Sequence, residues 1–141
     1  MKHKELMQQI KAAFASVPAP TEENIVCQEC WELRDDLRGR TPDELSDSWV
    51  ERNFDQLPLL SDDAKQFYLP AFLRVGALKP DSNVSQFVLY DLSENFRREP
   101  RGGYSPEQKQ AILDYLSFVE PQSEDVLKEY VARARTLWLG H

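Results

Sequence analysis

The amino-acid sequence predicts an all-α fold, a single compact domain of about six or seven helices over residues 1–141. In most segments apolar residues recur every three or four positions, which is the spacing of one helix face. Serine or threonine followed by proline and an acidic or amide residue marks several helix starts. No segment alternates apolar and polar residues as a half-buried strand would.

Three helices are expected in the N-terminal part of the chain. The first covers residues 6–17 and ends at Pro18, which cannot continue a helix. The second is expected over residues 21–37, which begin with Thr-Glu-Glu and precede a glycine. The third starts at Thr41, because Thr-Pro-Asp-Glu combines an N-cap, a proline in the first turn and a capping-box glutamate. Its apolar face carries Trp49.

The remaining helices are expected in residues 61–80, in residues 81–96, from residue 105 to the stop at Pro121, and over residues 123–138. Pro70 lies in the middle of the first of these. Proline lacks the amide hydrogen and disfavours helical geometry before it, so we expect this helix to be interrupted there, by a kink or as two short helices. The last helix should be capped by its first serine, and its buried stripe should consist of Val126, Leu127, Tyr130, Val131, Ala134, Leu137 and Trp138.

The composition is that of a globular chain with an acidic balance. With 141 residues, 41% of them apolar, one core suffices without disulfides or metal. Lys and Arg number 17 against 24 Asp and Glu, a formal net charge of −7, which argues against nucleic acid as the primary ligand and is compatible with a basic partner. No segment approaches the roughly 18 apolar residues of a membrane span, and no secretory signal is recognisable, so a cytoplasmic protein is expected.

Cys27 and Cys30 are the only cysteines and are spaced C-x-x-C. This spacing is found in redox dithiols, in half of a zinc site, and by chance in two small apolar residues on a helix. Acidic neighbours would raise the pKa of a thiol, and a zinc site needs a second pair of ligands. The sequence therefore favours two structural residues, with no metal and no cofactor, and leaves the other two interpretations open.

The two histidines, His3 and His141, lie at the ends of the chain. A general base must be held within hydrogen-bond reach of its partner, and chain ends are the positions least often held. Adjacent acid pairs such as Asp62-Asp63 lie at expected helix starts, where carboxylates stabilise the helix dipole. The sequence thus identifies no catalytic residue and favours a protein that is not an enzyme.

The segment RREPRGGY is the one local concentration of positive charge in an acidic chain. Its candidate contact residues are Arg97, Arg98, Arg101 and Tyr104. Arginines beside glycines can hold a phosphate or an acidic segment of a partner. No glycine-rich nucleotide motif is present, and a solvated loop is the commoner outcome for such a segment.

The segment FYLPAFL places Phe67, Tyr68 and Phe72 around Pro70. A kinked helix can open a groove for a partner, and aromatic residues are common anchors of such surfaces. A run that is apolar on several sides is more often buried by neighbouring helices. A partner surface and a place in the core are therefore both considered, with the core favoured.

The stretches LSDDAKQFYLPAFLRVGAL and YSPEQKQAILDYLSFV resemble a family of small, mostly helical bacterial proteins of unknown function. In that family a Leu-Pro-Ala motif follows an aromatic pair, and a Ser/Thr-x-x-Gln helix start, here Ser-Pro-Glu-Gln, comes later. The similarity covers about residues 18–119 and rests on packing and capping residues. The resemblance implies a helical bacterial protein and assigns no activity, cofactor or catalytic residue.

From these observations we expect a non-enzymatic helical interaction protein that binds another, basic, protein. One version is an inhibitor or immunity-type protein that covers its partner. The alternative is an enzyme or small-ligand-binding protein whose site consists of scattered polar residues around the loop from Arg97 to Tyr104. A pocket lined by convergent polar groups would favour the alternative, and an open acidic or apolar face would favour the interaction protein.

Overall fold

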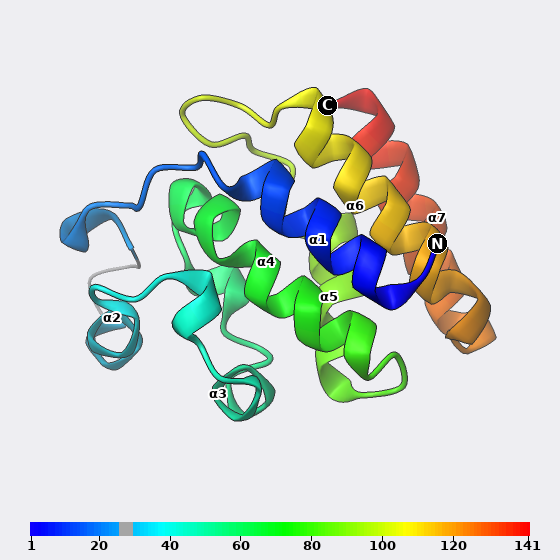
Figure 1. Cartoon of the computed structure of the whole chain (residues 1–141), viewed down its shortest axis with the longest axis horizontal. Helices are drawn as coiled ribbons and strands as arrows, with labels where there is room; N and C mark the ends of the chain where they lie inside the picture. Colours follow the sequence, from blue (N-terminus) through cyan, green and yellow to red (C-terminus); the bar gives the residue numbers. More distant parts are fainter. Residues whose placement is uncertain (26–29) are drawn as a thin grey trace.

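Five long helices pack together as the body of the molecule, and short helices lie along one side of it (Figure 1). The computed structural model describes residues 1–25 and 30–141. Its α-helices are α1 (His3–Phe14), α2 (Trp31–Leu37), α3 (Asp47–Arg52), α4 (Asp62–Leu78), α5 (Asn83–Glu94), α6 (Pro106–Val119) and α7 (Asp125–Gly140). The 3-10 turns are η1 (Glu22–Asn24), η2 (Pro42–Glu44), η3 (Leu57–Leu59) and η4 (Glu120–Gln122). These residues contain no strand, so the predicted all-α class and single domain are confirmed.

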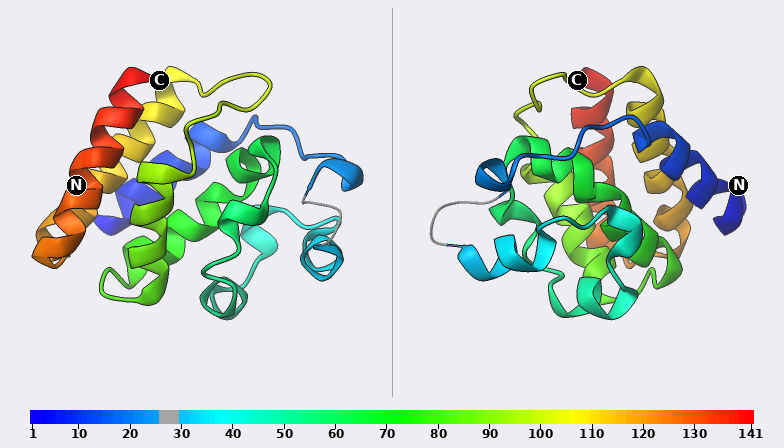
Figure 2. Two further views of the ribbon diagram at one scale, coloured as in Figure 1. Left: turned by 180° about the vertical axis from the view of Figure 1, so that it is seen from behind. Right: turned by 60° about the vertical axis from the view of Figure 1, so that its left-hand side comes forward.

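Helix α4 lies in the middle of the body, where it contacts α1, α5 and α6. Helix α1 packs on α4 and α6 and buries Leu6, Ile10 and Phe14. It ends at Phe14, a little earlier than expected and before Pro18. Helix α7 packs along α5 and α6 on the other side of the body, as the rear view in Figure 2 shows.

Helix α4 continues through Pro70 as one helix, so the two short helices expected as one form of the interruption do not occur, and the kink stays a prediction. The proline removes one backbone hydrogen bond and crowds the preceding turn. Its neighbours Leu69 and Ala71 are both completely buried, as are most side chains in the turns on either side. The apolar area buried on both sides of Pro70 thus offsets the missing hydrogen bond and keeps the two halves in one helix.

Residues 21–37 do not form the single helix that their start signal predicts. The turn η1 and the helix α2 occupy the two ends of this range, and residues 26–29 lie outside the described part. The carbonyl oxygens of Asn24 and Ile25 accept hydrogen bonds from the hydroxyl and the amide of Ser61. These carbonyls therefore pair with a distant segment, and tertiary hydrogen bonds replace the expected helix at this point.

The capping box predicted at Thr41 is present, but it begins the 3-10 turn η2 and not a long helix. The chain is extended at Leu45, and Ser46 then caps the separate helix α3. Arg74 on α4 donates hydrogen bonds to the carbonyl oxygens of Pro42, at 3.2 Å, and Leu45, at 2.6 Å. The arginine therefore stabilises the break in the expected helix.

Helix α7 buries most of its predicted stripe, through Leu127, Val131, Ala134 and Trp138. Val126, predicted to be buried, is 62% exposed. The predicted cap, Ser123, donates its hydroxyl to the carbonyl oxygen of Val119 on α6, and Glu124 takes the N-cap position. Helix α6 does begin at the predicted capping box, which Ser105 forms with Gln108.

Candidate functional site

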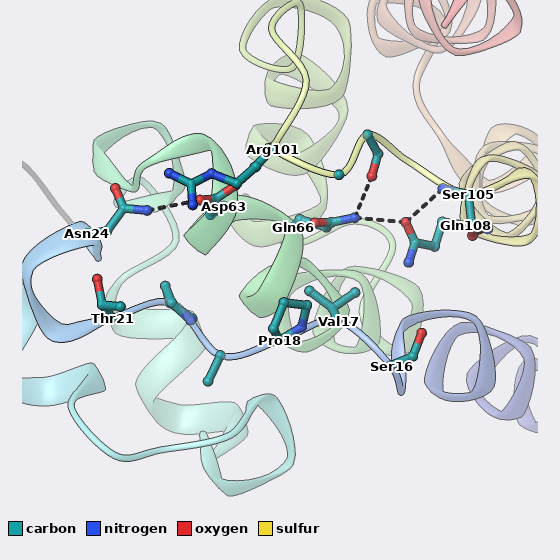
Figure 3. Close-up of a pocket in the computed structure, with 14 residues that line it drawn as sticks. Ser16, Val17, Pro18, Thr21, Asn24, Asp63, Gln66, Arg101, Ser105 and Gln108 are labelled. Carbon is teal, nitrogen blue, oxygen red and sulfur yellow. Dashed lines mark hydrogen bonds between the residues drawn. The ribbon is translucent and has the colours of Figure 1, made fainter.

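A hollow with a volume of about 700 Å³ lies between α4 and the two segments beside it, and is called here the polar pocket (Figure 3). One wall is the segment 16–21 that follows α1, and the other is the loop 101–105 that precedes α6. Side chains of α4 form the floor between them. The pocket is lined by Ser16, Val17, Pro18, Ala19, Pro20, Thr21, Asn24, Asp63, Gln66, Arg101, Gly102, Gly103, Ser105 and Gln108.

Two buried glutamines hold the walls of the polar pocket in place. Gln66 is 8% exposed and donates from Nε2 to the carbonyl oxygen of Gly103, at 3.0 Å, and to Oε1 of Gln108, at 2.9 Å. Gln108 is 4% exposed, accepts from the amide of Ser105 and donates to the carbonyl oxygen of Ala13. Because buried polar groups are costly unless they are paired, this network keeps α4, α6 and the loop in fixed relative positions.

At the other end of the polar pocket, Asp63 connects Asn24 to the backbone of the loop that contains Arg101. One of its carboxylate oxygens accepts from Nδ2 of Asn24 at 2.9 Å, and the other accepts from the backbone amide of Arg101 at 2.9 Å. The next residues of the loop turn back through Gly103, whose φ of 69° favours glycine. The backbone of Arg101 is therefore fixed, while its guanidinium has no carboxylate within ion-pair distance among the described residues.

The four residues predicted in the arginine-rich loop have different surroundings. Arg97 is exposed and pairs with Glu94 at 2.8 Å, and Arg98 is exposed and lies 3.5 Å from Asp62. Arg101 lines the polar pocket. The remaining residue, Tyr104, is only 6% exposed and packs its ring on Trp138, and burial raises the pKa of its hydroxyl. Tyr104 therefore belongs to the core and is not available to a partner in this structure.

The three aromatic residues of FYLPAFL also differ in burial: one lines a groove and two lie in the core. Phe67 is half-buried and lines an apolar groove of about 380 Å³ between α1, α4 and η2, together with Pro70. Tyr68 is 2% exposed and donates its hydroxyl to the carbonyl oxygens of Leu37 and Arg40, both at 2.9 Å. Phe72 is 1% exposed. Tyr68 and Phe72 are therefore core residues and not contacts for a partner. Of the three aromatic residues only Phe67 lines a groove.

His141 is held by polar contacts, contrary to the expectation from its position, whereas Nε2 of His3 is buried and has no hydrogen-bond partner among the described residues. Nε2 of His141 lies 2.8 Å from the carbonyl oxygen of Phe96, its Nδ1 lies 3.5 Å from Glu99, and its ring packs on Trp138. His3 lies against Phe118. Both ring nitrogens of His141 face acceptors of this chain, so neither is placed to take a proton from a substrate. The arrangement is structural.

The C-x-x-C motif is only partly described. Cys30 is half-buried against the core at the start of α2 and is disulfide-bonded, which differs from the small apolar thiol that the sequence favours. Cys27 lies outside the described residues. In the described part of the chain no three His, Cys, Asp or Glu side chains converge as metal ligands.

The net charge of the chain is confined to one part of the molecule. Residues 21–60, which we call the acidic layer, contain eleven Asp and Glu and four Lys and Arg, a formal charge of −7. All other residues carry thirteen of each and are neutral together. In the described part of this layer the exposed carboxylates are Glu22, Glu23, Glu32, Asp35, Asp36, Asp43, Glu44, Asp47 and Asp55. The layer contains η1 to η3, α2 and α3, at the side of the body in Figure 1.

Sequence reasoning found Arg101 but missed the other polar groups of its pocket. In the sequence Gln66 is one polar residue of an apolar helix, and Gln108 is half of a capping box. Asn24 and Asp63 are 39 residues apart and meet because Ser61 draws the two segments together. A glutamine on the apolar side of a helix is the one signal in the sequence that pointed to a buried polar network.

No protein-family model, no curated protein sequence and no solved structure matches this chain. The resemblance to a family of small bacterial proteins therefore stays a prediction. Among the described helices, none has the length and apolar character needed to cross a membrane.

Proposed function

We propose that this chain is a non-enzymatic interaction protein whose acidic layer covers a basic surface of another protein, as an inhibitor or immunity-type protein does. The observation that carries the proposal is the confinement of the whole net charge of −7 to residues 21–60. A one-sided field of this kind attracts a partner of opposite charge and disfavours acidic ones.

Several carboxylates of the acidic layer are open to a partner. Glu23, Glu32 and Asp55 are exposed and form no ion pair within the described part of the chain. Others pair with the body: Asp43 lies 3.2 Å from Lys11, and Asp47 lies 3.1 Å from Arg74. These exposed pairs contribute little energy, so a cationic partner can compete for their carboxylates.

Charge reversal tests the proposal. The triple variant Glu23→Lys, Glu32→Lys, Asp55→Lys reverses three exposed carboxylates of the acidic layer, and the matched control reverses Asp81, Glu107 and Glu129 outside it. Each protein is used for affinity capture from its host, and captured partners are then titrated by calorimetry at low and high salt.

We expect the wild type and the control to bind a basic protein with salt-sensitive affinity, and the acidic-layer variant to lose at least tenfold in affinity, about 1.4 kcal/mol. A partner that is acidic, or one bound equally by both triple variants, would contradict the proposal. Both variants are first checked by thermal unfolding, so that loss of folding is not mistaken for loss of binding.

A further inference from the structure

We propose that the polar pocket binds a small organic carboxylate that also carries an N–H donor, an amino acid or the C-terminal residue of a short peptide. This is a second binding site, which borders the acidic layer and shares Thr21 and Asn24 with it. Its volume of about 700 Å³ lies within the range typical of small-molecule sites.

The cation for the carboxylate is Arg101. Of the three arginines in the loop, Arg97 and Arg98 have carboxylate partners, and only Arg101 leaves its guanidinium unpaired among the described residues. Its backbone is nevertheless fixed by Asp63, at 2.9 Å from the amide. A positioned guanidinium matches the two oxygens of a carboxylate, and this fit adds geometric specificity to the attraction.

Acceptors for the N–H donor lie along the same pocket. Gln66 donates two hydrogen bonds from Nε2, and its Oε1 has no partner in the described part of the chain. Asn24 likewise donates Nδ2 to Asp63 and leaves Oδ1 unused. In Figure 3, Asn24 and Arg101 lie at one end and Gln66 lies farther along the same pocket. A ligand held by Arg101 therefore meets acceptors beside it.

The walls of the pocket favour a ligand with an apolar part, and the pocket leaves room for the ligand to extend beyond it. The segment from Val17 to Pro20 contributes mostly aliphatic and proline side chains. Two smaller hollows continue the pocket. One shares Asn24, Asp63 and Arg101 with it, and the other shares Ser16 and Ser105. The continuity allows a peptide chain to leave the pocket once its terminal residue is bound.

The charge of the pocket excludes strongly anionic ligands. Asp63 places a carboxyl group in the pocket, where it accepts hydrogen bonds from Asn24 and from the amide of Arg101. A phosphate would bring close to two negative charges beside this carboxylate, whereas a zwitterion places a positive or neutral N–H group there. Asp63 therefore selects a carboxylate with a neighbouring N–H group over a phosphate.

The test is an NMR titration of the ¹⁵N-labelled protein. The probes are the free amino acids, their N-acetyl derivatives as models of a peptide end, their amides, acetate, and inorganic phosphate. We expect at least one amino acid or N-acetyl amino acid to bind with a dissociation constant below about 1 mM, with shifts at Gly102 and Gly103. Binding of the free form or of the N-acetyl form separates the two sources of the ligand.

Variants decide whether the proposed groups make the contacts. Arg101→Gln should weaken binding at least tenfold, and Arg97→Gln, which changes a paired arginine outside the pocket, should leave binding unchanged. The matching amide and acetate should bind at least tenfold more weakly than the best probe. The proposal is overturned if no probe saturates below about 10 mM, if phosphate binds more tightly, or if folded Arg101→Gln binds like wild type.

Discussion

Asp91 is a carboxyl group in the core, on the face of α5 that packs against the other helices. It is 1% exposed, its Oδ1 accepts from Nδ2 of Asn95 at 2.6 Å, and its Oδ2 has no partner among the described residues. Burial raises the pKa of Asp91 to about 6, while the hydrogen bond from Asn95 and the charge of Lys65 lower it by less. The folded state therefore holds a proton on Asp91 at a pH where the unfolded chain has lost it.

The first prediction concerns the pH dependence of stability. Between the unfolded pKa of 3.8 and the folded pKa of about 6, the folded state binds more protons, so stability falls as the pH rises. Relative to Asp91→Asn, we expect the free energy of unfolding of the wild type to decrease by about 2 kcal/mol between about pH 4 and pH 7. Urea unfolding at several pH values measures it. Parallel pH curves for the two proteins would refute the raised pKa.

Gly76 and Tyr115 show a close approach between α4 and α6. A Cβ atom at Gly76 would overlap the hydroxyl oxygen of Tyr115, while the ring carbon that bears this hydroxyl would lie at 3.4 Å. Tyr115 is completely buried, and its hydroxyl has no regular hydrogen-bond partner. Glycine is thus required by the space that the hydroxyl occupies and not by its own backbone conformation.

The second prediction concerns the coupling between Gly76 and Tyr115, which a double-mutant cycle measures. Gly76→Ala should destabilise the wild type by about 1–3 kcal/mol, because a fully buried ring has little room to move. In the Tyr115→Phe background the same substitution should be neutral or stabilising, because alanine favours a helix over glycine by about 1 kcal/mol. Urea unfolding of the four proteins gives the coupling energy. Additive effects would show that the hydroxyl is not the obstacle.

At the scale of elements, Arg74 connects α4 to η2 and α3. Its guanidinium donates to the carbonyl oxygens of Pro42 and Leu45 and to Asp47. The carbonyl oxygen of Pro42 also accepts from the amide of Leu45, at 3.2 Å, which closes the turn η2. We infer that one side chain of α4 attaches this part of the acidic layer to the body.

The third prediction follows from this attachment. Arg74→Ala should destabilise the protein by about 1–3 kcal/mol and should increase amide hydrogen exchange over residues 42–52 more than in α6. Arg52→Ala is the control, because Arg52 is exposed and has no partner in the described part of the chain. Equal exchange in the two variants would show that Arg74 does not hold these turns.

The sequence predicts a helix well when the backbone hydrogen bonds of that helix stay within it, and poorly when distant residues accept or donate them. Helices α1, α6 and α7 combine a local apolar stripe with bonds inside the helix, and the sequence predicts each of them within a few residues. The expected helices over residues 21–37 and from Thr41 fail because Ser61 and Arg74, distant in the chain, take their carbonyl oxygens. A start signal shows where a turn begins and not how far it continues.

The same reason limits what the sequence tells about the candidate site. Arg101 stands out because it lies in a basic loop of an acidic chain. The partners that build the pocket, such as Asn24 and Gln108, come from segments that meet only after folding. Tyr104 and Phe72 are surface candidates in the sequence because aromatic residues occur in both cores and interfaces, and only their burial in the folded chain distinguishes the two.

At the scale of the whole molecule, α7 completes the core. It buries Leu127, Val131 and Trp138, and Nε1 of Trp138 donates to the carbonyl oxygen of Leu92 on α5 at 3.1 Å. The ring of Trp138 also packs on Phe96 and Tyr104, the residues at the two ends of the arginine-rich loop. The last helix therefore supports both α5 and the loop that carries the polar pocket.

The fourth prediction is that deletion of residues 124–141 prevents stable folding. Loss of several large side chains from a core costs about 2–5 kcal/mol each, against a total stability of about 5–15 kcal/mol. Circular dichroism and thermal unfolding of the truncated protein measure the effect, with Leu139→Ala, at a 68% exposed position, as a control that should fold normally. A monomeric truncation that melts cooperatively near the wild-type temperature would refute it.

The confinement of net charge to residues 21–60 also makes the molecule an electric dipole, with its negative end at the acidic layer. A cationic surface at a distance exerts a torque on such a dipole and turns the acidic layer toward itself before any contact forms. In physiological salt this guidance acts over about 8 Å, the Debye length. It therefore accelerates the formation of a complex more than it prolongs its lifetime, and the association rate is the quantity most sensitive to charge in the layer.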